Sequence, residues 1–177
     1  KSRVLEIEVK VKVENLQTLR DQLLALGARV ERERAIEDDT FYDFRPAALL
    51  RKKHALRLRT VKKKAFLTFK GTPQKSRKFK VREEHETEVK NLKQTKRILK
   101  ALGFGPVFRF AKHRTVFKQG RLKICLDETP IGLFIEFEGE RQNIVRLAKR
   151  LQLPKARWIK KDYVRLMKDS GEKALEE

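Results

Sequence analysis

The first strand of the chain is predicted by a strict alternation of apolar and charged side chains. Odd positions from Leu5 to Val13 are apolar, and even positions from Glu6 to Lys12 are charged. A period of two is that of a β-strand, so the charged side chains share one face. Neighbours on that face lie about 7 Å apart, twice the rise per residue of a strand. Such a face is either solvated, as in most half-buried strands, or turned toward a ligand.

The same period predicts seven more strands, and the helical period predicts four helices. The strands are expected at residues 40–45, 55–61, 64–70, 79–89, 108–118, 122–128 and 132–139. The first two helices begin at the capping residues Asn15 and Asn91 and end at Gly27 and Gly103. The other two helices are expected at residues 141–151 and 159–168, and loops or single turns at 46–53 and 71–78.

A repeat with a constant offset of 76 residues relates the two halves of the chain. In both halves a strand with a Glu-x-Glu pattern precedes an Asn-Leu pair and a helix that ends in Ala-Leu-Gly, at 15–27 and at 91–103. Phe41 and Phe117 keep the same offset. We therefore predict an α+β fold: an antiparallel eight-stranded β-barrel built from two similar halves, with the helices packed outside.

Composition limits the classes of function. The 177 residues carry a formal net charge of +21, and 39% of them are charged, against about 25% in an average protein. Such a charge attracts polyanions: nucleic acid, polyphosphate, nucleotides or an acidic membrane surface. The single cysteine, Cys125, excludes an internal disulfide and a cysteine zinc cluster, and no apolar run is long enough to span a membrane. We expect one cytoplasmic domain over residues 1–169, a disordered tail at 170–177, and no membrane partner.

The charged strand faces are expected to turn into the barrel, because the amphipathic helices can cover the apolar faces from outside. Acids, bases and ligands would then have to compensate one another in one enclosure. The inward acids would be Glu6, Glu8, Glu84, Glu86, Asp127, Glu136 and Glu138. The inward bases would be Lys10, Arg57, Arg59, Lys70, Arg82, Lys112 and Arg114. Carboxylates suit Mg²⁺ or Mn²⁺, and arginines and lysines suit phosphate oxygens, so such a cavity fits a metal-bound polyphosphate.

The charged motifs follow one another in an order that is typical of a known family. They are Glu6-x-Glu8-x-Lys10, Leu56-Arg57-Leu58-Arg59, Thr68-Phe69-Lys70-Gly71, Arg82-Glu83-Glu84-x-Glu86, Lys112-x-Arg114, Leu126-Asp127-Glu128 and Phe134-x-Glu136-x-Glu138-Gly139. This ordered set resembles the CYTH superfamily, the triphosphate tunnel metalloenzymes, over residues 4–166. The compact length is most similar to the class IV adenylyl cyclase branch, which also contains triphosphate hydrolases. One departure is Asp162 before Tyr163, where the family often has Ser-Tyr.

The resemblance implies an enzyme that holds a triphosphate in the barrel tunnel with two divalent ions, Mg²⁺ or Mn²⁺. The catalytic residues would be Glu6, Glu8 and Lys10. The metal shell would be Glu6, Glu8, Asp127, Glu136 and Glu138. The substrate-binding residues would be Lys10, Arg57, Arg59, Lys70, Arg82, Lys112 and Arg114. Glu84 and Glu86 would either orient these bases or join the metal shell.

Two reactions stay open for this site. In an adenylyl cyclase the ribose 3′-hydroxyl of ATP attacks the α-phosphorus and pyrophosphate leaves; in an inorganic or thiamine triphosphatase water attacks the terminal phosphorus. Candidates for stacking on a base are Phe41, Tyr42, Phe44, Phe66 and Phe110. A non-catalytic polyphosphate- or nucleic-acid-binding protein is a less favoured alternative, because carboxylates on the same strand faces repel phosphate. The resemblance leaves a homodimer open.

Overall fold

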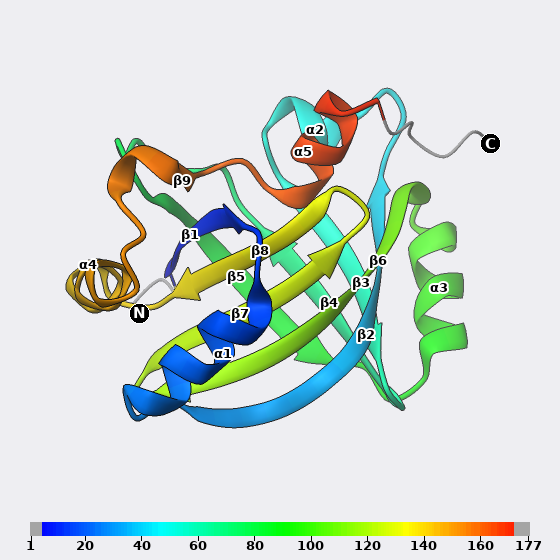
Figure 1. Cartoon of the computed structure of the whole chain (residues 1–177). Helices are drawn as coiled ribbons and strands as arrows, with labels where there is room; N and C mark the ends of the chain where they lie inside the picture. Colours follow the sequence, from blue (N-terminus) through cyan, green and yellow to red (C-terminus); the bar gives the residue numbers. More distant parts are fainter. Residues whose placement is uncertain (1–4, 172–177) are drawn as a thin grey trace.

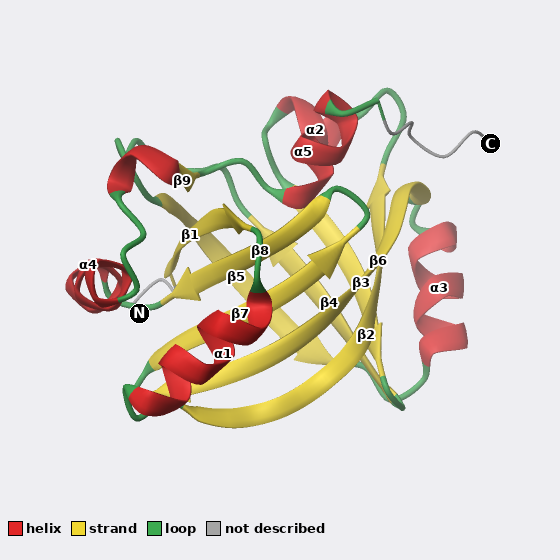
Figure 2. Ribbon diagram, viewed as in Figure 1, coloured by secondary structure: helices red, strands yellow, loops and turns green. Residues whose placement is uncertain are grey.

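Eight antiparallel strands close into a barrel (Figure 1, Figure 2) in the order β5-β4-β3-β2-β6-β7-β8-β1, and β1 pairs back with β5. The computed structural model describes residues 5–171. The barrel strands are β1 (Leu5–Val13), β2 (Arg29–Asp43), β3 (Ala55–Val61), β4 (Lys64–Lys70), β5 (Lys80–Glu88), β6 (Gly105–Gln119), β7 (Leu122–Thr129) and β8 (Gly132–Glu138). A short strand, β9 (Trp158–Ile159), extends the pairing of β1. The predicted eight-stranded α+β barrel is confirmed.

Three of the five helices in the described residues cover the outside of the barrel and bury its apolar strand faces: α1 (Leu16–Ala25), α3 (Leu92–Ala101) and α4 (Arg141–Arg150). The other helices are α2 (Ala48–Arg51) and α5 (Tyr163–Asp169), with a 3₁₀ turn, η1, at Lys155–Arg157. The main core packs α1 and α4 onto the apolar faces of β1, β7 and β8. A smaller core packs Leu99 of α3 against Tyr42 and Leu58 on β2 and β3. This cover leaves the charged strand faces for the interior of the barrel.

Strand β2 is much longer than the sequence predicts. A strand was expected only at residues 40–45, whereas β2 begins at Arg29 and ends at Asp43. Two features hide it. Eight of the eleven positions from 29 to 39 are charged, on both strand faces. The pairing with β6 also shifts register three times, and two of these shifts, between Val30 and Arg32 and between Arg32 and Ala35, fall in the stretch that the prediction lacks. Such bulges break the two-residue period on which the prediction depends.

The last helix was expected at residues 159–168, but α5 begins later, after the cap residue Asp162. Its Tyr163 and Met167 pack against Phe108, Phe110 and Phe134. Because Phe110 also lines the space inside the barrel, α5 lies over one end of the barrel, unlike α1, α3 and α4.

The internal repeat is confirmed in two successive elements: α3 and β6 begin and end 76 residues after α1 and β2. Asn15 and Asn91 each accept a hydrogen bond of 3.0 Å from the backbone N–H three residues on, as N-caps do. Phe41 and Phe117 keep the offset in sequence but not the side they face. Phe41 lines the space inside the barrel, and Phe117 is fully buried in the outer core. The expected tail at 170–177 lies almost wholly outside the described residues.

Candidate active site

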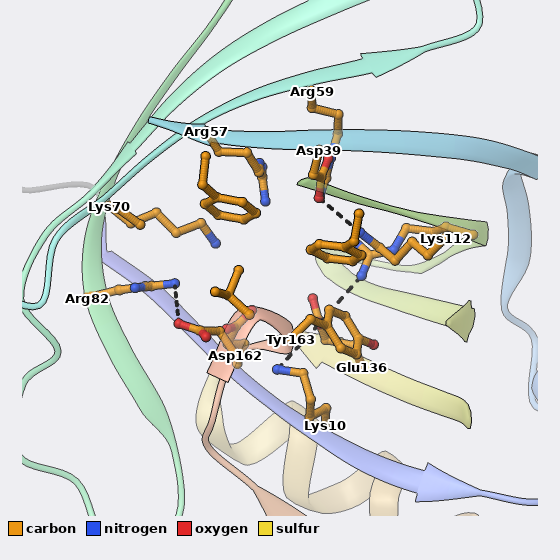
Figure 3. A pocket seen from close by; sticks show the side chains of 16 residues that line it. Lys10, Asp39, Arg57, Arg59, Lys70, Arg82, Lys112, Glu136, Asp162 and Tyr163 are labelled. Atoms are coloured by element: carbon orange, nitrogen blue, oxygen red, sulfur yellow. Dashed lines mark hydrogen bonds and ion pairs between the residues drawn. The ribbon is translucent and has the colours of Figure 1, made fainter. Parts of the chain in front are cut away.

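The inward strand faces line one cavity inside the barrel (Figure 3). It holds about 530 Å³ of space not filled by atoms, including open solvent at its mouth. All the cations that the sequence places inside line it: Lys10, Arg57, Arg59, Lys70, Arg82, Lys112 and Arg114. The acids that line it are Glu8, Asp39, Glu136 and Asp162. The predicted cations therefore all face this cavity, whereas five of the seven acids expected inside do not line it: Glu6, Glu84, Glu86, Asp127 and Glu138.

On one wall of the cavity, carboxylates already neutralise the cations. Arg59 donates two hydrogen bonds to Asp39, at 2.7 and 2.8 Å, and Arg114 donates two to Asp127, both at 2.6 Å. Glu37 lies between the two arginines, 3.1 Å from Arg59 and 3.7 Å from Arg114. Burial alone would raise the pKa of Asp39, but Arg59 holds that pKa well below its ordinary value. These two bidentate arginine–carboxylate pairs hold the side chains of this wall in a fixed geometry.

Sequence reasoning missed Glu37 and Asp39, although both are almost fully buried in this network. Both lie on β2, in the stretch that was not recognised as a strand. The signal that could have found them is their two-residue spacing in step with Phe41, which also faces inward.

Around the rest of the cavity, on β3 and β5, buried cations have donors to spare. The Nε atoms of Arg57 and Arg82 are buried and have no hydrogen-bond acceptor within residues 5–171. Arg57 lies 3.4 Å from Glu86, and Arg82 lies 4.0 Å from Asp162. Burial lowers the pKa of Arg57, and the neighbouring Arg59 lowers it further. Because an unpaired buried donor is costly, the part of the cavity around Arg57 and Arg82 is suited to an anion.

Carboxylates from β1 and β8 gather beside these cations. Glu6 accepts a hydrogen bond of 2.8 Å from Lys70, and Glu136 lies 3.8 Å from Lys10. Glu8 is only 5% exposed, yet it makes no hydrogen bond or ion pair with any described residue. Burial raises the pKa of its cross-strand partner Glu138, and the charge of Glu6 raises it further. Burial and Glu6 raise the pKa of Glu8, but Lys70, Lys10 and Lys80 lower it below its ordinary value, so Glu8 stays a carboxylate. An ionised carboxylate with no direct partner among the described residues, beside other carboxylates, can accept a divalent ion.

Only some of the five carboxylates predicted to bind metal are placed so that they could do so. Glu6, Glu8, Glu136 and Glu138 offer the hard oxygen donors that Mg²⁺ and Mn²⁺ prefer. Within residues 5–171, however, no group of three or more Asp, Glu, His or Cys side chains is spaced to hold an ion by itself. Asp127 binds Arg114 with both oxygens and also accepts a hydrogen bond from the Tyr163 hydroxyl, so its lone pairs are committed. We therefore keep the four glutamates as candidate ligands and leave Asp127 out.

Glu84 and Glu86 contact bases. Glu84 lies 3.6 Å from Lys70. Glu86 accepts hydrogen bonds from Thr68 at 2.6 Å and from Arg57 at 3.4 Å. Of the two roles that the sequence leaves open, orientation of the bases is the one that these contacts support.

Asp162, the departure from the family motif, reaches into the cavity from the start of α5 (Figure 3). It accepts a hydrogen bond of 3.0 Å from Lys80 and caps α5 by accepting from the N–H of Arg165. Burial would raise the pKa of Asp162, but Lys80 lowers it, so the side chain stays a carboxylate. Lys80 is a further buried base that the sequence did not select, although it shares a strand face with Arg82. The Asp162 carboxylate thus lies beside Lys80 and Arg82, where a phosphate group could otherwise bind.

Two of the aromatic candidates lie together at the cavity. Phe41 and Phe110 stack with their ring centroids 6.2 Å apart and their planes inclined by 6°, and both line the cavity. Tyr42 belongs to the outer core beneath α3, and Phe44 packs on Phe104 with centroids 3.9 Å apart. An aromatic wall beside a cationic one can hold a molecule that has both a ring and charged groups.

These features agree with what comparison with known proteins shows: a CYTH domain model matches residues 5–161, so the chain belongs to the CYTH domain family. A Methanocaldococcus jannaschii protein named "Putative adenylate cyclase" is 29% identical over 178 aligned residues, which cover 92% of this chain and 98% of that protein.

Solved structures share the fold. A Vibrio parahaemolyticus protein, also named a "putative adenylate cyclase", superposes with a TM-score of 0.84 at 23% identity, covering 94% of this chain and 99% of its own. A Hippeastrum protein named a "putative adenylyl cyclase", described as having a dominant triphosphatase activity, superposes with a TM-score of 0.67 at 18% identity, covering 93% and 96%. No helix within residues 5–171 is long and apolar enough to cross a membrane.

Proposed function

We propose that the protein is an adenylyl cyclase that binds ATP in the barrel cavity with a divalent metal ion and forms cyclic AMP and pyrophosphate. The observation that carries the proposal is the pairing of two kinds of unsatisfied group in one cavity. Among residues 5–171, Arg57 and Arg82 each bury an Nε–H that has no acceptor, and Glu8 is a buried carboxylate that makes no direct hydrogen bond or ion pair. A triphosphate and a metal ion would satisfy both.

The cations divide the work of holding the phosphates. Arg57 and Arg82 would bind phosphate oxygens directly, because each has a buried Nε–H without an acceptor among the described residues. Lys70 would join them with the ammonium donors that its hydrogen bond to Glu6 leaves over. Arg59 and Arg114 would chiefly fix the positions of their neighbours, because each guanidinium already donates two hydrogen bonds, to Asp39 and to Asp127 respectively. Fixing the phosphates against a rigid wall supplies the alignment and charge neutralisation that nucleotidyl transfer needs.

The metal ion would be held by Glu8 and Glu136, with Glu6 and Glu138 next to them on the same two strands. Lys10 lies among these groups, 3.8 Å from Glu136, where its ammonium can hold an anionic oxygen close to the metal. When bound, a divalent ion makes an attacking hydroxyl more acidic and neutralises the charge of the leaving pyrophosphate.

The cyclase reaction also needs the nucleoside to fold back over its own phosphates. The 3′-hydroxyl oxygen then forms a bond to the α-phosphorus, its proton is released, and the bond from the α-phosphorus to the bridging oxygen of pyrophosphate breaks. The stacked pair Phe41 and Phe110 offers an apolar surface for the base. A triphosphatase would use the same cations with water as the nucleophile, and it would not need this surface.

Product analysis tests the proposal. The purified protein is incubated with Mg²⁺ or Mn²⁺ and, separately, with ATP, inorganic tripolyphosphate and thiamine triphosphate, and the products are separated by chromatography. Cyclic AMP and pyrophosphate are the expected products from ATP. Orthophosphate without a cyclic nucleotide would make the protein a triphosphatase, and the absence of turnover with all three would reject an enzyme of either kind acting on these substrates.

Asp162→Asn is expected to tighten the binding of inorganic tripolyphosphate by roughly three- to tenfold. The substitution removes a negative charge 3.0 Å from Lys80, while the asparagine can still cap α5. Calorimetric titration measures the affinity, and Asp169→Asn is the control, because it removes the same charge at an exposed position of the same helix. Equal or weaker binding by Asp162→Asn would show that the carboxylate does not compete with phosphate.

Lys112 is expected to make tripolyphosphate binding depend on pH. Burial, with the nearby charge of Arg59, lowers the pKa of Lys112 to about 8, although Asp39 partly offsets this. Its ammonium is therefore lost as the pH rises through 8, and affinity should fall by up to about tenfold one pH unit above that pKa. Lys112→Arg, which stays charged, should remove this step. A step that persists in the arginine variant would assign the titration to another group.

A further inference from the structure

The large positive charge of the protein lies on its outer surface and not in the cavity. The buried charged residues nearly cancel, with six bases against seven acids. The bases are Lys10, Lys70, Lys80, Arg82, Lys112 and Arg114, and the acids are Glu6, Glu8, Glu37, Asp39, Asp43, Asp127 and Glu136. The formal net charge of +21 is therefore carried by residues outside this buried set. A triphosphate in the cavity does not account for it.

One part of the surface concentrates this charge on helix α3 and the neighbouring turn between β3 and β4. Its residues are Lys62, Lys63, Lys64, Lys90, Lys93, Lys96, Arg97 and Lys100, which we call the α3 basic face. All eight are exposed. A hydrogen bond from the N–H of Val89, in the segment just before α3, to the carbonyl of Ala65 on β4 holds this segment beside the turn. Figure 1 shows α3 standing along the side of the barrel, away from α4 on the far side.

The spacing along α3 puts its cations on one side. Leu92, Thr95 and Leu99 face the barrel and are buried or half-buried. Lys93 and Lys100, with Lys96 and Arg97 between them, follow the three- and four-residue spacing of a single helix face turned to solvent. From Lys93 to Lys100 the helix rises about 10 Å, so the cations form a row along its axis.

These cations lack carboxylate partners. Within residues 5–171 only Lys64 has one, Glu88, at 4.0 Å. Some exposed arginines elsewhere are paired, Arg34 with Glu128 at 2.7 Å and Arg109 with Asp38 at 2.6 Å. Others, such as Arg146 and Arg150 on α4, also lack a carboxylate partner among the described residues, so α4 is the matched comparison for α3. A row of cations that the chain leaves uncompensated repels itself and attracts a polyanion.

The observations favour a nucleic acid as this polyanion. The phosphates of a nucleic acid form a regular row of charges, which the row on α3 complements. A membrane-binding helix would turn a broad apolar face outward. Helix α3 instead uses its apolar face to pack on the barrel, and exposes only Ile98 and Leu102 as large aliphatic side chains. The strand faces on which carboxylates alternate with cations, and would repel a nucleic acid, belong to the barrel strands and not to α3.

We propose that the α3 basic face binds the phosphate backbone of nucleic acid, without reading its sequence, as a second binding surface outside the barrel. This proposal does not depend on the reaction proposed for the cavity. The backbone would contact the lysine and arginine side chains as point charges, so binding should weaken steeply with salt.

The test uses a duplex DNA of about 20 base pairs with 5′-hydroxyl ends, in EDTA, so that neither a triphosphate nor a divalent ion engages the cavity. Fluorescence anisotropy measures the affinity at salt concentrations from about 50 to 200 mM. The test variant carries Lys93→Ala, Lys96→Ala and Lys100→Ala. The control variant carries Arg146→Ala, Lys149→Ala and Arg150→Ala, which remove three exposed cations from α4. Thermal unfolding verifies that both variants are folded.

The α3 variant should bind the duplex at least about tenfold more weakly. Its plot of log affinity against log salt should be shallower by about 2 to 3, close to one unit for each lost phosphate contact. The control variant should bind within about twofold of the wild type. Equal weakening of both variants would show attraction to overall charge and overturn the proposal. So would binding of the wild type to phosphatidylserine vesicles but not to the duplex.

Discussion

Glu8→Gln is expected to lower metal-dependent turnover by roughly 10²- to 10³-fold, the range for loss of one well-placed electrostatic contact. Glu8 is the buried carboxylate of the cavity that has no cation partner among the described residues, and it lies beside Glu136 on the wall that we assign to the metal. The glutamine has the same size but no charge. Initial rates with Mg²⁺ and with Mn²⁺ measure the effect.

The fold should survive this substitution, because Glu8 makes no hydrogen bond or ion pair with any residue from 5 to 171 that the amide would break. Circular dichroism and thermal unfolding check this point. Glu31→Gln serves as the control, because Glu31 is an exposed carboxylate on β2. Unchanged turnover by the folded Glu8→Gln protein would remove Glu8 from the site.

Arg57→Gln is expected to weaken the binding of inorganic tripolyphosphate by about 10- to 100-fold, which corresponds to the loss of charged hydrogen bonds worth about 1.5 to 3 kcal/mol. The side chain lines the cavity and has an unpaired Nε–H. Calorimetric titration with and without Mg²⁺ measures the change. Because the phosphates are held in both reactions, the prediction applies to a cyclase and to a triphosphatase.

The matched control is Arg109→Gln. Arg109 lies on β6 but is exposed, and its fork binds Asp38 through hydrogen bonds of 2.9 and 2.6 Å. It should leave tripolyphosphate affinity within about twofold of the wild type. Equal affinities of the wild type and Arg57→Gln would place the triphosphate elsewhere on the protein.

Most of the barrel could be predicted because its strands are short, regular and alternate in polarity. The period of two identified every predicted cation that lines the cavity, on β1, β3, β4, β5 and β6. Of the seven acids predicted to face inward, only Glu8 and Glu136 line it. The prediction failed on β2, where charges on both faces and the register shifts removed the period. Glu37 and Asp39, which hold one wall together, were lost with that strand.

Roles that depend on strand pairing could not be read from one strand at a time. The family resemblance implies a metal-binding role for Asp127, one of the carboxylates expected inside the barrel. It lies directly across from Arg114 in the pairing of β6 and β7, however, and the arginine takes both of its oxygens. The approach of α5 is a tertiary contact of the same kind, and it brings Asp162 to Lys80 over 82 positions in the sequence.

The most direct test of the central claim is a crystal structure of the protein with Mn²⁺ and a non-hydrolysable ATP analogue, with anomalous scattering used to locate the manganese. We predict the triphosphate against Arg57, Lys70 and Arg82, and an anomalous peak at Glu8 and Glu136. Displacement of Asp162 from Lys80 by the phosphates would agree with the competition described above. A triphosphate bound on the outer surface, with manganese absent from the cavity, would contradict the account.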